Sequence, residues 1–134
     1  MARVLVAALG VAMLLAPLGA GGADAPDALS VEWHGKHPCT KLYEDARIVI
    51  ARCTLAPGEV HVRHSHPGYF GYALSGGTAR VEDAQGTREE KIATGDAFDS
   101  PAIAWHEVTN IGDTPLTFLI VEKKYQPVGR GAGQ

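Results

Sequence analysis

The sequence predicts an all-β fold in a single domain, and three observations carry this prediction. Short runs rich in β-branched and apolar residues, such as 47–55 and 115–121, are bounded by clusters of Gly, Pro, Asn and Asp. Turn signals recur roughly every 8–12 residues, which is typical of a sandwich or barrel. No segment after residue 23 has a convincing helical pattern, and 134 residues is the length of one domain.

Seven segments fit strands when the chain is followed in order. Residues 36–43 and 47–55 form a predicted hairpin around Glu44–Asp45–Ala46. The other five predicted strands are 70–75, 78–82, 87–92, 105–109 and 115–121. The turns that follow or separate them are 56–59, 83–86, 94–97 and 110–113.

The first 23 residues have the layout of a secretory signal peptide. Arg3 gives a short positive start, Val4–Leu18 is almost wholly apolar, and small residues crowd Gly19–Ala25. The apolar stretch is interrupted by Gly and Pro and is well short of the about 20 residues that a membrane anchor needs. We therefore expect cleavage after Ala23, a periplasmic or secreted protein, and no membrane contact once the segment is removed.

The globular domain is expected over 24–125, followed by a flexible tail over 126–134 that has glycines and no core pattern. The whole chain has 12 basic and 15 acidic residues, a net charge of −3 with neutral His. The basic residues are scattered, and Lys123–Lys124 is the one adjacent pair. Nucleic-acid binding needs clustered Lys and Arg, so this class of function is excluded.

Cys39 and Cys53 are the two cysteines of the chain, and export permits a disulfide between them. A two-residue turn at Glu44–Asp45 places Cys39 opposite Ile50, whereas a three-residue turn over 45–47 places it opposite Cys53. A disulfide and a pair of half-buried free thiols are both compatible with the sequence.

Two histidines form the first candidate site. His64 and His66 are two residues apart and point to the same face of a strand, so both imidazoles can close on one metal ion. His61 has the opposite parity and is expected to face away, at the surface or behind the ligands. A further histidine, His106, lies about forty residues downstream.

The segments 58–76 and 95–110, which contain these histidines, resemble the two sequence motifs of the cupin superfamily. The first, G(X)5HXH(X)3,4E(X)6G, is matched by Gly58, His64, His66 and Gly76. The second, G(X)5PXG(X)2H(X)3N, is matched by Gly95, Pro101, His106 and Asn110, with Ile103 in place of the family glycine. The resemblance implies a single-domain, cupin-type jelly-roll β-barrel with a metal in its mouth.

Two shorter stretches narrow the resemblance. Val31–Lys36 and Leu74–Thr78 look like small single-domain cupins described as beta-alanine degradation proteins. This likeness says little about chemistry, because one fold carries unrelated activities.

The sequence departs from the first motif at the glutamate ligand. The family position falls on Tyr69, or on Phe70 when it is counted from Gly77, and neither residue has a carboxylate. The ligand set implied by the resemblance is therefore reduced to His64, His66 and His106. Three imidazoles with open positions suit a divalent transition metal, namely Fe, Mn, Ni, Cu or Zn.

Tyr69 is the candidate catalytic residue. Its phenol can ligate the metal, donate a hydrogen bond to a metal-bound water or serve as a general base. The alternative is a purely structural role in packing.

The remaining candidates are expected at the surface or in the core. Surface positions are expected for His34, His37 and Glu107. Core positions are expected for Phe98 and Trp105, unless one of them lines the pocket. Surface charges are expected at Arg52 and Arg63, unless one offers its guanidinium to a carboxylate substrate.

Three functions fit these observations. The first is a metal-dependent oxidoreductase of dioxygenase type acting on a small polar or carboxylate substrate, because a neutral ligand shell favours an anionic substrate and three-His sites occur in the thiol dioxygenase branch that the ligand set resembles. The second is a metal-dependent lyase or isomerase with Tyr69 as base. The third is a non-catalytic module that holds a metal or small ligand. We favour the enzyme, and open β edges also permit a homodimer.

Overall fold

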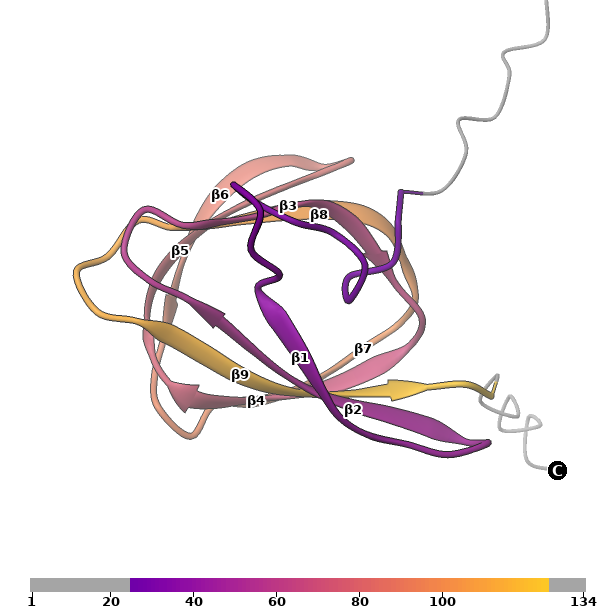
Figure 1. Ribbon diagram of the computed structural model, residues 1–134. Coiled ribbons are helices and arrows are strands. Elements are labelled where there is room, and N and C mark those ends of the chain that lie inside the picture. Colours follow the sequence, from indigo (N-terminus) through magenta and orange to yellow (C-terminus); the bar gives the residue numbers. More distant parts are fainter. Residues whose placement is uncertain (1–24, 126–134) are drawn as a thin grey trace, which may run out of the picture.

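The computed structural model describes residues 25–125 as two antiparallel β-sheets that face each other (Figure 1). The signal peptide expected over 1–23 and the tail expected over 126–134 lie outside the described residues. Within 25–125 the regular elements are all strands, which confirms the all-β prediction. No helix in this part of the chain is long and apolar enough to cross a membrane.

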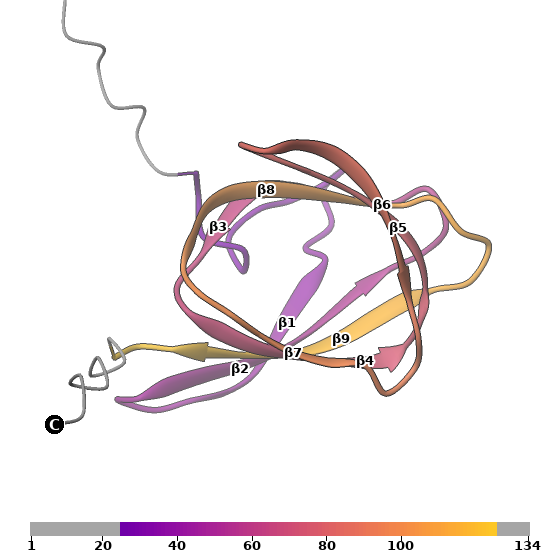
Figure 2. The same ribbon diagram turned by 180° about the vertical axis from the view of Figure 1, so that it is seen from behind.

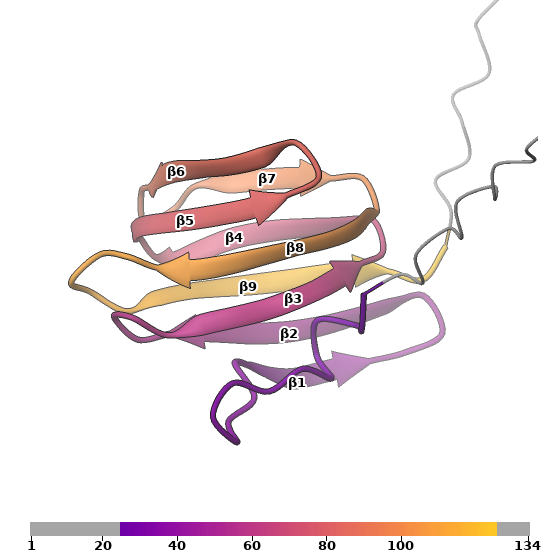
Figure 3. The same ribbon diagram turned by 90° about the horizontal axis from the view of Figure 1, so that it is seen from above.

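The strands divide into a five-stranded and a four-stranded sheet, seen one behind the other in Figure 3. The first has the order β1-β2-β9-β4-β7, formed by β1 (Cys39–Glu44), β2 (Ile48–Leu55), β9 (Leu116–Lys123), β4 (Tyr69–Ser75) and β7 (Ala97–Ser100). The second has the order β3-β8-β5-β6, formed by β3 (Val60–His66), β8 (Ile103–Asn110), β5 (Gly77–Asp83) and β6 (Gly86–Ile92).

The jelly-roll fold class is confirmed, with one difference in how the sheets meet. Strands β6 and β7 are the edges of different sheets and do not pair, so the two sheets lie face to face without closing into a barrel (Figure 2). The sequence does not predict β7, because its four residues lack β-branched side chains and the strand forms through pairing with β4. The open side between β6 and β7 matters for access to the interior.

The β1–β2 hairpin contains a disulfide between Cys39 and Cys53. Neither predicted turn is right, because the hairpin pairs Glu44 with Val49 around a longer turn. A β-bulge at residue 42 then shifts the register, so Cys39 still lies opposite Cys53. The alternative of two free thiols is thereby excluded.

Two motif residues have structural roles outside the site. A Cβ on Gly76 would lie 2.2 Å from the carbonyl oxygen of Ile92, so only glycine fits there. Asn110 is fully buried, and its side-chain amide donates hydrogen bonds of 2.8 Å to the carbonyl oxygens of Leu55 and Thr114. These contacts join β8 to the ends of β2 and the turn before β9.

Two apolar clusters form the core between the sheets. One contains Cys39, Cys53, Tyr69 and Ile120. The other contains Leu55, Ala79, Val81 and Leu116. The half-buried Phe118 packs against both clusters. The candidate site lies in the space that these clusters enclose.

Candidate metal centre

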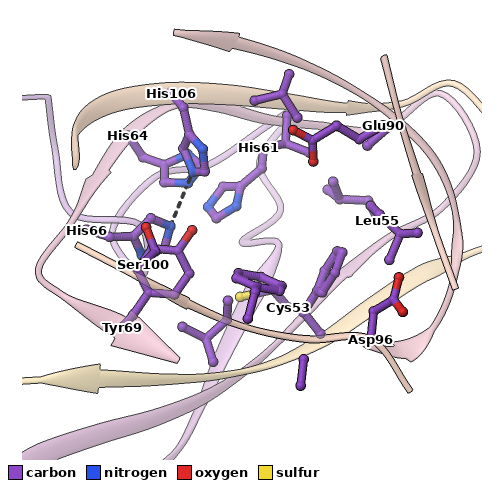
Figure 4. A pocket seen from close by; sticks show the side chains of 18 of the residues that line it. Cys53, Leu55, His61, His64, His66, Tyr69, Glu90, Asp96, Ser100 and His106 are labelled. Carbon is purple, nitrogen blue, oxygen red and sulfur yellow. Dashed lines mark hydrogen bonds between the residues drawn. The ribbon is translucent and has the colours of Figure 1, made fainter. Parts of the chain in front are cut away.

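Three histidines from two neighbouring strands converge inside the domain (Figure 4). His64 and His66 lie on β3, and His106 lies on β8 directly opposite His64. The Nε2 atom of His64 lies 3.0 Å from Nε2 of His66 and 2.8 Å from Nε2 of His106. The structure thus brings together all three residues that the sequence singles out as metal ligands.

The outer nitrogens of His64 and His66 are held by groups that only accept hydrogen bonds. Nδ1 of His64 donates to the carbonyl oxygen of Val62 at 2.7 Å, and Nδ1 of His66 donates to Oε1 of Glu122 at 2.7 Å. In the neutral imidazoles these bonds leave both Nε2 atoms as lone pairs that face each other.

This donor set fits a transition metal. Two facing lone pairs repel unless a cation lies between them, and metal–imidazole bonds of about 2.0–2.1 Å place nitrogens that share one ion roughly 3–3.5 Å apart. The Nε2–Nε2 distance of 3.0 Å is at the short end of that range, and the distance of 2.8 Å is slightly below it. The cluster is therefore compatible with metal binding.

Burial keeps His64 and His106 neutral. Desolvation, with further repulsion from neighbouring histidines, lowers the pKa of His64 from 6.5 to about 2. The same causes lower the pKa of His106 from 6.5 to about 3. Near neutral pH both rings are thus in the unprotonated form that binds metal ions.

Glu122 is a site residue that sequence reasoning missed. It lies on β9 opposite Tyr69 of β4, is 3% exposed, and holds the far side of the His66 ring. The carboxylate absent from the first motif is thus present nearby, behind a ligand. Its signal in the sequence is weak, because 56 residues separate Glu122 from His66 and because Glu122 lies just beyond the predicted strand 115–121.

The ring of His61 does not face away from the cluster, as its parity predicted, but lies behind the candidate ligands, which is one of the two positions expected for it. Its ring is 6% exposed and stacks on His64 with centroids 3.6 Å apart. A register shift in β3 between His61 and His64 reverses the parity expected from a regular strand. Nε2 of His61 donates to the carbonyl oxygen of Ala28 at 2.8 Å, so His61 packs behind the cluster and is no part of it.

Tyr69 lies beside the cluster, with its ring 4.5 Å from the ring of His66 between centroids. Burial raises the pKa of its phenol, and a hydrogen bond with Ser100 only partly opposes this. Tyr69 is therefore a neutral hydrogen-bond donor near pH 7 rather than a phenolate. This state suits a donor to a bound ligand better than a general base.

A cavity of about 540 Å³ extends from the histidines between the sheets and is lined by residues of β6 and β7 on its open side. Phe98 lines this cavity and is 38% exposed, so it is no core residue, whereas the half-buried Trp105 borders a second, smaller cavity. The two cavities share Tyr69, Arg88, Ser100 and His106. The candidate ligands are thus accessible from the cavity.

The arginines singled out in the sequence lie outside the cavity. Arg52 is exposed, and the exposed Arg63 stacks over Trp105 with its guanidinium carbon 4.0 Å from the ring centroid. The arginine that lines the cavity is Arg88 on β6. The sequence does not single it out, because the charged residues of β6 show no pattern that tells which of them face the interior. His34 and His37 are exposed as expected.

A two-sheet jelly roll with three histidines converging in its cavity is the architecture of a small-molecule or metal-binding β domain. The model of the cupin domain family matches residues 51–122, so this chain belongs to the cupin family. Cupins commonly bind small-molecule ligands or metals. No curated protein sequence matches the chain.

Solved structures support the same fold. A cupin domain from Bordetella pertussis Tohama I superposes with a TM-score of 0.62 at 23% identity, covering 65% of this chain and 92% of that one. An RmlC-like cupin with a double-stranded β-helix fold from Methanocaldococcus jannaschii has a TM-score of 0.53 at 21% identity, covering 63% and 77%. The polyketide cyclase RemF from Streptomyces resistomycificus has a TM-score of 0.53 at 24% identity, covering 66% of each chain.

Proposed function

We propose that the protein is a metal-dependent cupin enzyme of oxygenase type, acting on a small molecule in the periplasm or outside the cell. One observation carries the proposal: the Nε2 atoms of His64, His66 and His106 converge, while the Nδ1 atoms of His64 and His66 are held by a carbonyl and a carboxylate. Three imidazole nitrogens at this spacing suit a divalent transition metal. Bound there, a redox-active divalent metal would supply open coordination positions for a substrate and for O2.

The residues around the ligands have separate tasks in this proposal. Glu122 orients His66 and strengthens it as a ligand. Tyr69 donates a hydrogen bond from its neutral phenol to a substrate oxygen, and its ring covers one face of His66. The two sheets exclude water from the inner end of the cavity, where His64 is fully buried. A polar group of the substrate is thereby held among few and well-oriented partners.

A non-catalytic module that holds a metal or ligand is the second candidate. The first motif lacks its carboxylate ligand, and the nearest buried carboxylate, Glu122, contacts Nδ1 of His66. A lyase or isomerase with Tyr69 as base is less favoured, because burial raises the pKa of the phenol.

Two observations support export. The segment over 1–23 has the order of charged, apolar and small residues of a signal peptide. The disulfide between Cys39 and Cys53 suits an oxidising compartment. The stretches that resemble beta-alanine degradation proteins, Val31–Lys36 and Leu74–Thr78, do not line the cavity, so the proposal does not rest on that likeness.

The test is metal content and oxygen consumption of the mature protein. Purified from its native compartment, it should hold about one transition metal per chain, which His64→Ala and His106→Ala should lose. The exposed His34→Ala is the matched control and should keep the metal. O2 uptake that requires both Fe(II) and a substrate supports an oxygenase, whereas ligand binding without turnover supports the module. A folded wild-type protein that takes up no metal contradicts the enzyme and leaves a module that binds a small ligand without metal.

A further inference from the structure

The cavity changes character along its length. Figure 4 shows the three histidines at one end and Leu55, Glu90 and Asp96 at the other, with Cys53 between them. The wall beyond the histidines is largely apolar and comes from both core clusters, with Cys53, Val81, Val108, Phe118 and Ile120. A ligand that fills the cavity therefore has one end at the histidines and most of its body against apolar side chains.

The charged groups of the wall lie on the edge strand β6 and on the segment that leads through β7. Arg88 is engaged by two carboxylates, since Nη1 donates to Asp83 at 2.6 Å and Nε donates to Glu90 at 2.7 Å. Lys91 is exposed, and Asp99 pairs with Lys123. Among the described residues that line the cavity, the Lys and Arg side chains are Arg88 and Lys91, and both are exposed on the edge strand β6.

The volume of the cavity also favours a ligand with a large apolar part. A space of about 540 Å³ is within the range of pockets that enclose drug-sized molecules. A three- or four-carbon acid would leave most of the apolar wall in contact with water, which is unfavourable in proportion to the exposed area. Aromatic rings also border the space, with the centroids of Phe98 and Phe118 6.4 Å apart.

The cavity thus has histidines at one end and a largely apolar wall beyond them. From this difference we infer that the site takes a molecule with a polar, metal-binding head and an apolar, ring-sized body, rather than a small polar acid. The inference rests on the proposed metal site for the head alone. The body would lie between Leu55, Val81 and Phe118, and the molecule would enter between the unpaired edges of β6 and β7.

The experiment keeps the head constant and varies the body. Acetohydroxamic, benzohydroxamic and 2-naphthohydroxamic acids are titrated calorimetrically into the Co(II)-loaded mature protein. Benzohydroxamate should bind at least about tenfold more tightly than acetohydroxamate, because its ring is buried against the apolar wall. Ala79→Phe, which fills this part of the cavity, should abolish the gain and leave acetohydroxamate binding unchanged. Ala93→Phe, at an exposed position outside the cavity, is the matched control and should keep the tighter binding of benzohydroxamate.

The outcomes separate this inference from the proposed function. Equal affinities for all three hydroxamates with Co(II) bound would overturn the inference and leave the metal site intact. If Co(II) does not bind, the fluorescence of 2-naphthol with metal-free protein decides: binding that Ala79→Phe removes supports the apolar compartment, and no binding overturns it. Should Ala79→Phe fail to fold, Ile92→Trp fills the same compartment from the edge strand β6.

Discussion

Glu122 lies directly behind His66, and its Oε1 atom accepts the Nδ1–H proton of that ring at 2.7 Å with both side chains buried. The two residues belong to opposite sheets, β9 and β3. The bond therefore links the sheets at the point where the ligands converge. It fixes the tautomer of His66 without placing a carboxylate among the ligands.

Replacing this carboxylate should weaken metal binding without abolishing it. Glu122→Gln keeps the shape and one acceptor oxygen but removes the charge that strengthens His66 as a ligand. We expect metal affinity to fall about 10–100-fold, as is usual for partners behind a ligand. Competition with a chromophoric chelator measures the change. Glu82→Gln, at the surface pair with Arg80, is the control, and an unchanged affinity in Glu122→Gln would contradict the assigned role.

Replacement by Phe should reduce the metal content of the protein at His106 but not at His61. His106→Phe removes one of the three converging nitrogens and should reduce metal content to background. His61→Phe keeps the stacking on His64 and loses the contacts of Nε2 with Ala28 and Cys39, so it should retain most of the metal. Elemental analysis measures the metal content of both variants, and circular dichroism checks that they are folded. Complete metal loss in a folded His61→Phe would show that His61 is a ligand.

Acid should destabilise the metal-free protein over a defined range. Burial lowers the pKa values of His61, His64 and His106 from 6.5 to about 4, 2 and 3. The unfolded chain thus binds protons below pH 6.5 that the folded chain does not bind, so stability is full above that pH and falls below it. Each histidine contributes up to about 1.4 kcal/mol per pH unit.

Urea unfolding of the metal-free protein between pH 7 and pH 5 measures this dependence. The variant His106→Gln should show a smaller slope, because one of the three groups is gone. A free energy of unfolding that stays constant over this range would contradict the burial of neutral histidines.

Loss of the disulfide should reduce global stability. The bond joins residues 14 apart, and closing a loop of that size contributes about 3 kcal/mol in the chain-entropy description. The double variant Cys39→Ser/Cys53→Ser should unfold at a correspondingly lower urea concentration. A reductant should lower the midpoint of the wild type and leave that of the double variant unchanged. Equal midpoints without reductant would contradict the prediction.

The motif glycine at position 76 should not tolerate even one methyl group. Its Cβ would meet backbone atoms of 92–94, which cannot move aside as a side chain can. Gly76→Ala should therefore destabilise the fold by about 1–3 kcal/mol or more. Gly68→Ala is the matched control, since its Cβ would lie 3.7 Å or more from its neighbours. Similar thermal midpoints for both variants would contradict the assigned close approach.

The sequence predicts the local part of this site well. His64, His66 and His106 are marked by spacing within single strands, and the glycines and Asn110 by their places around turns. Residues that reach the site through pairing of distant strands are not marked in this way. Glu122 joins the site through the β4–β9 register and the facing of the sheets, and His61 joins it through an irregularity in β3. A strict alternation of faces misplaces His61, and it puts Glu122 on the inward face of β9 without showing that it meets His66.

The disulfide between Cys39 and Cys53 lies at the wall of the cavity. Cys53 is part of the cavity wall, and the sulfur of Cys39 lies 3.9 Å from Nε2 of His61. The disulfide therefore ties β1 to β2 directly behind this part of the wall. A copy of the chain retained in a reducing cytosol would carry the histidines beside a looser wall. For a chain that leaves the cytosol, completion of the binding site would thus be a step that follows export.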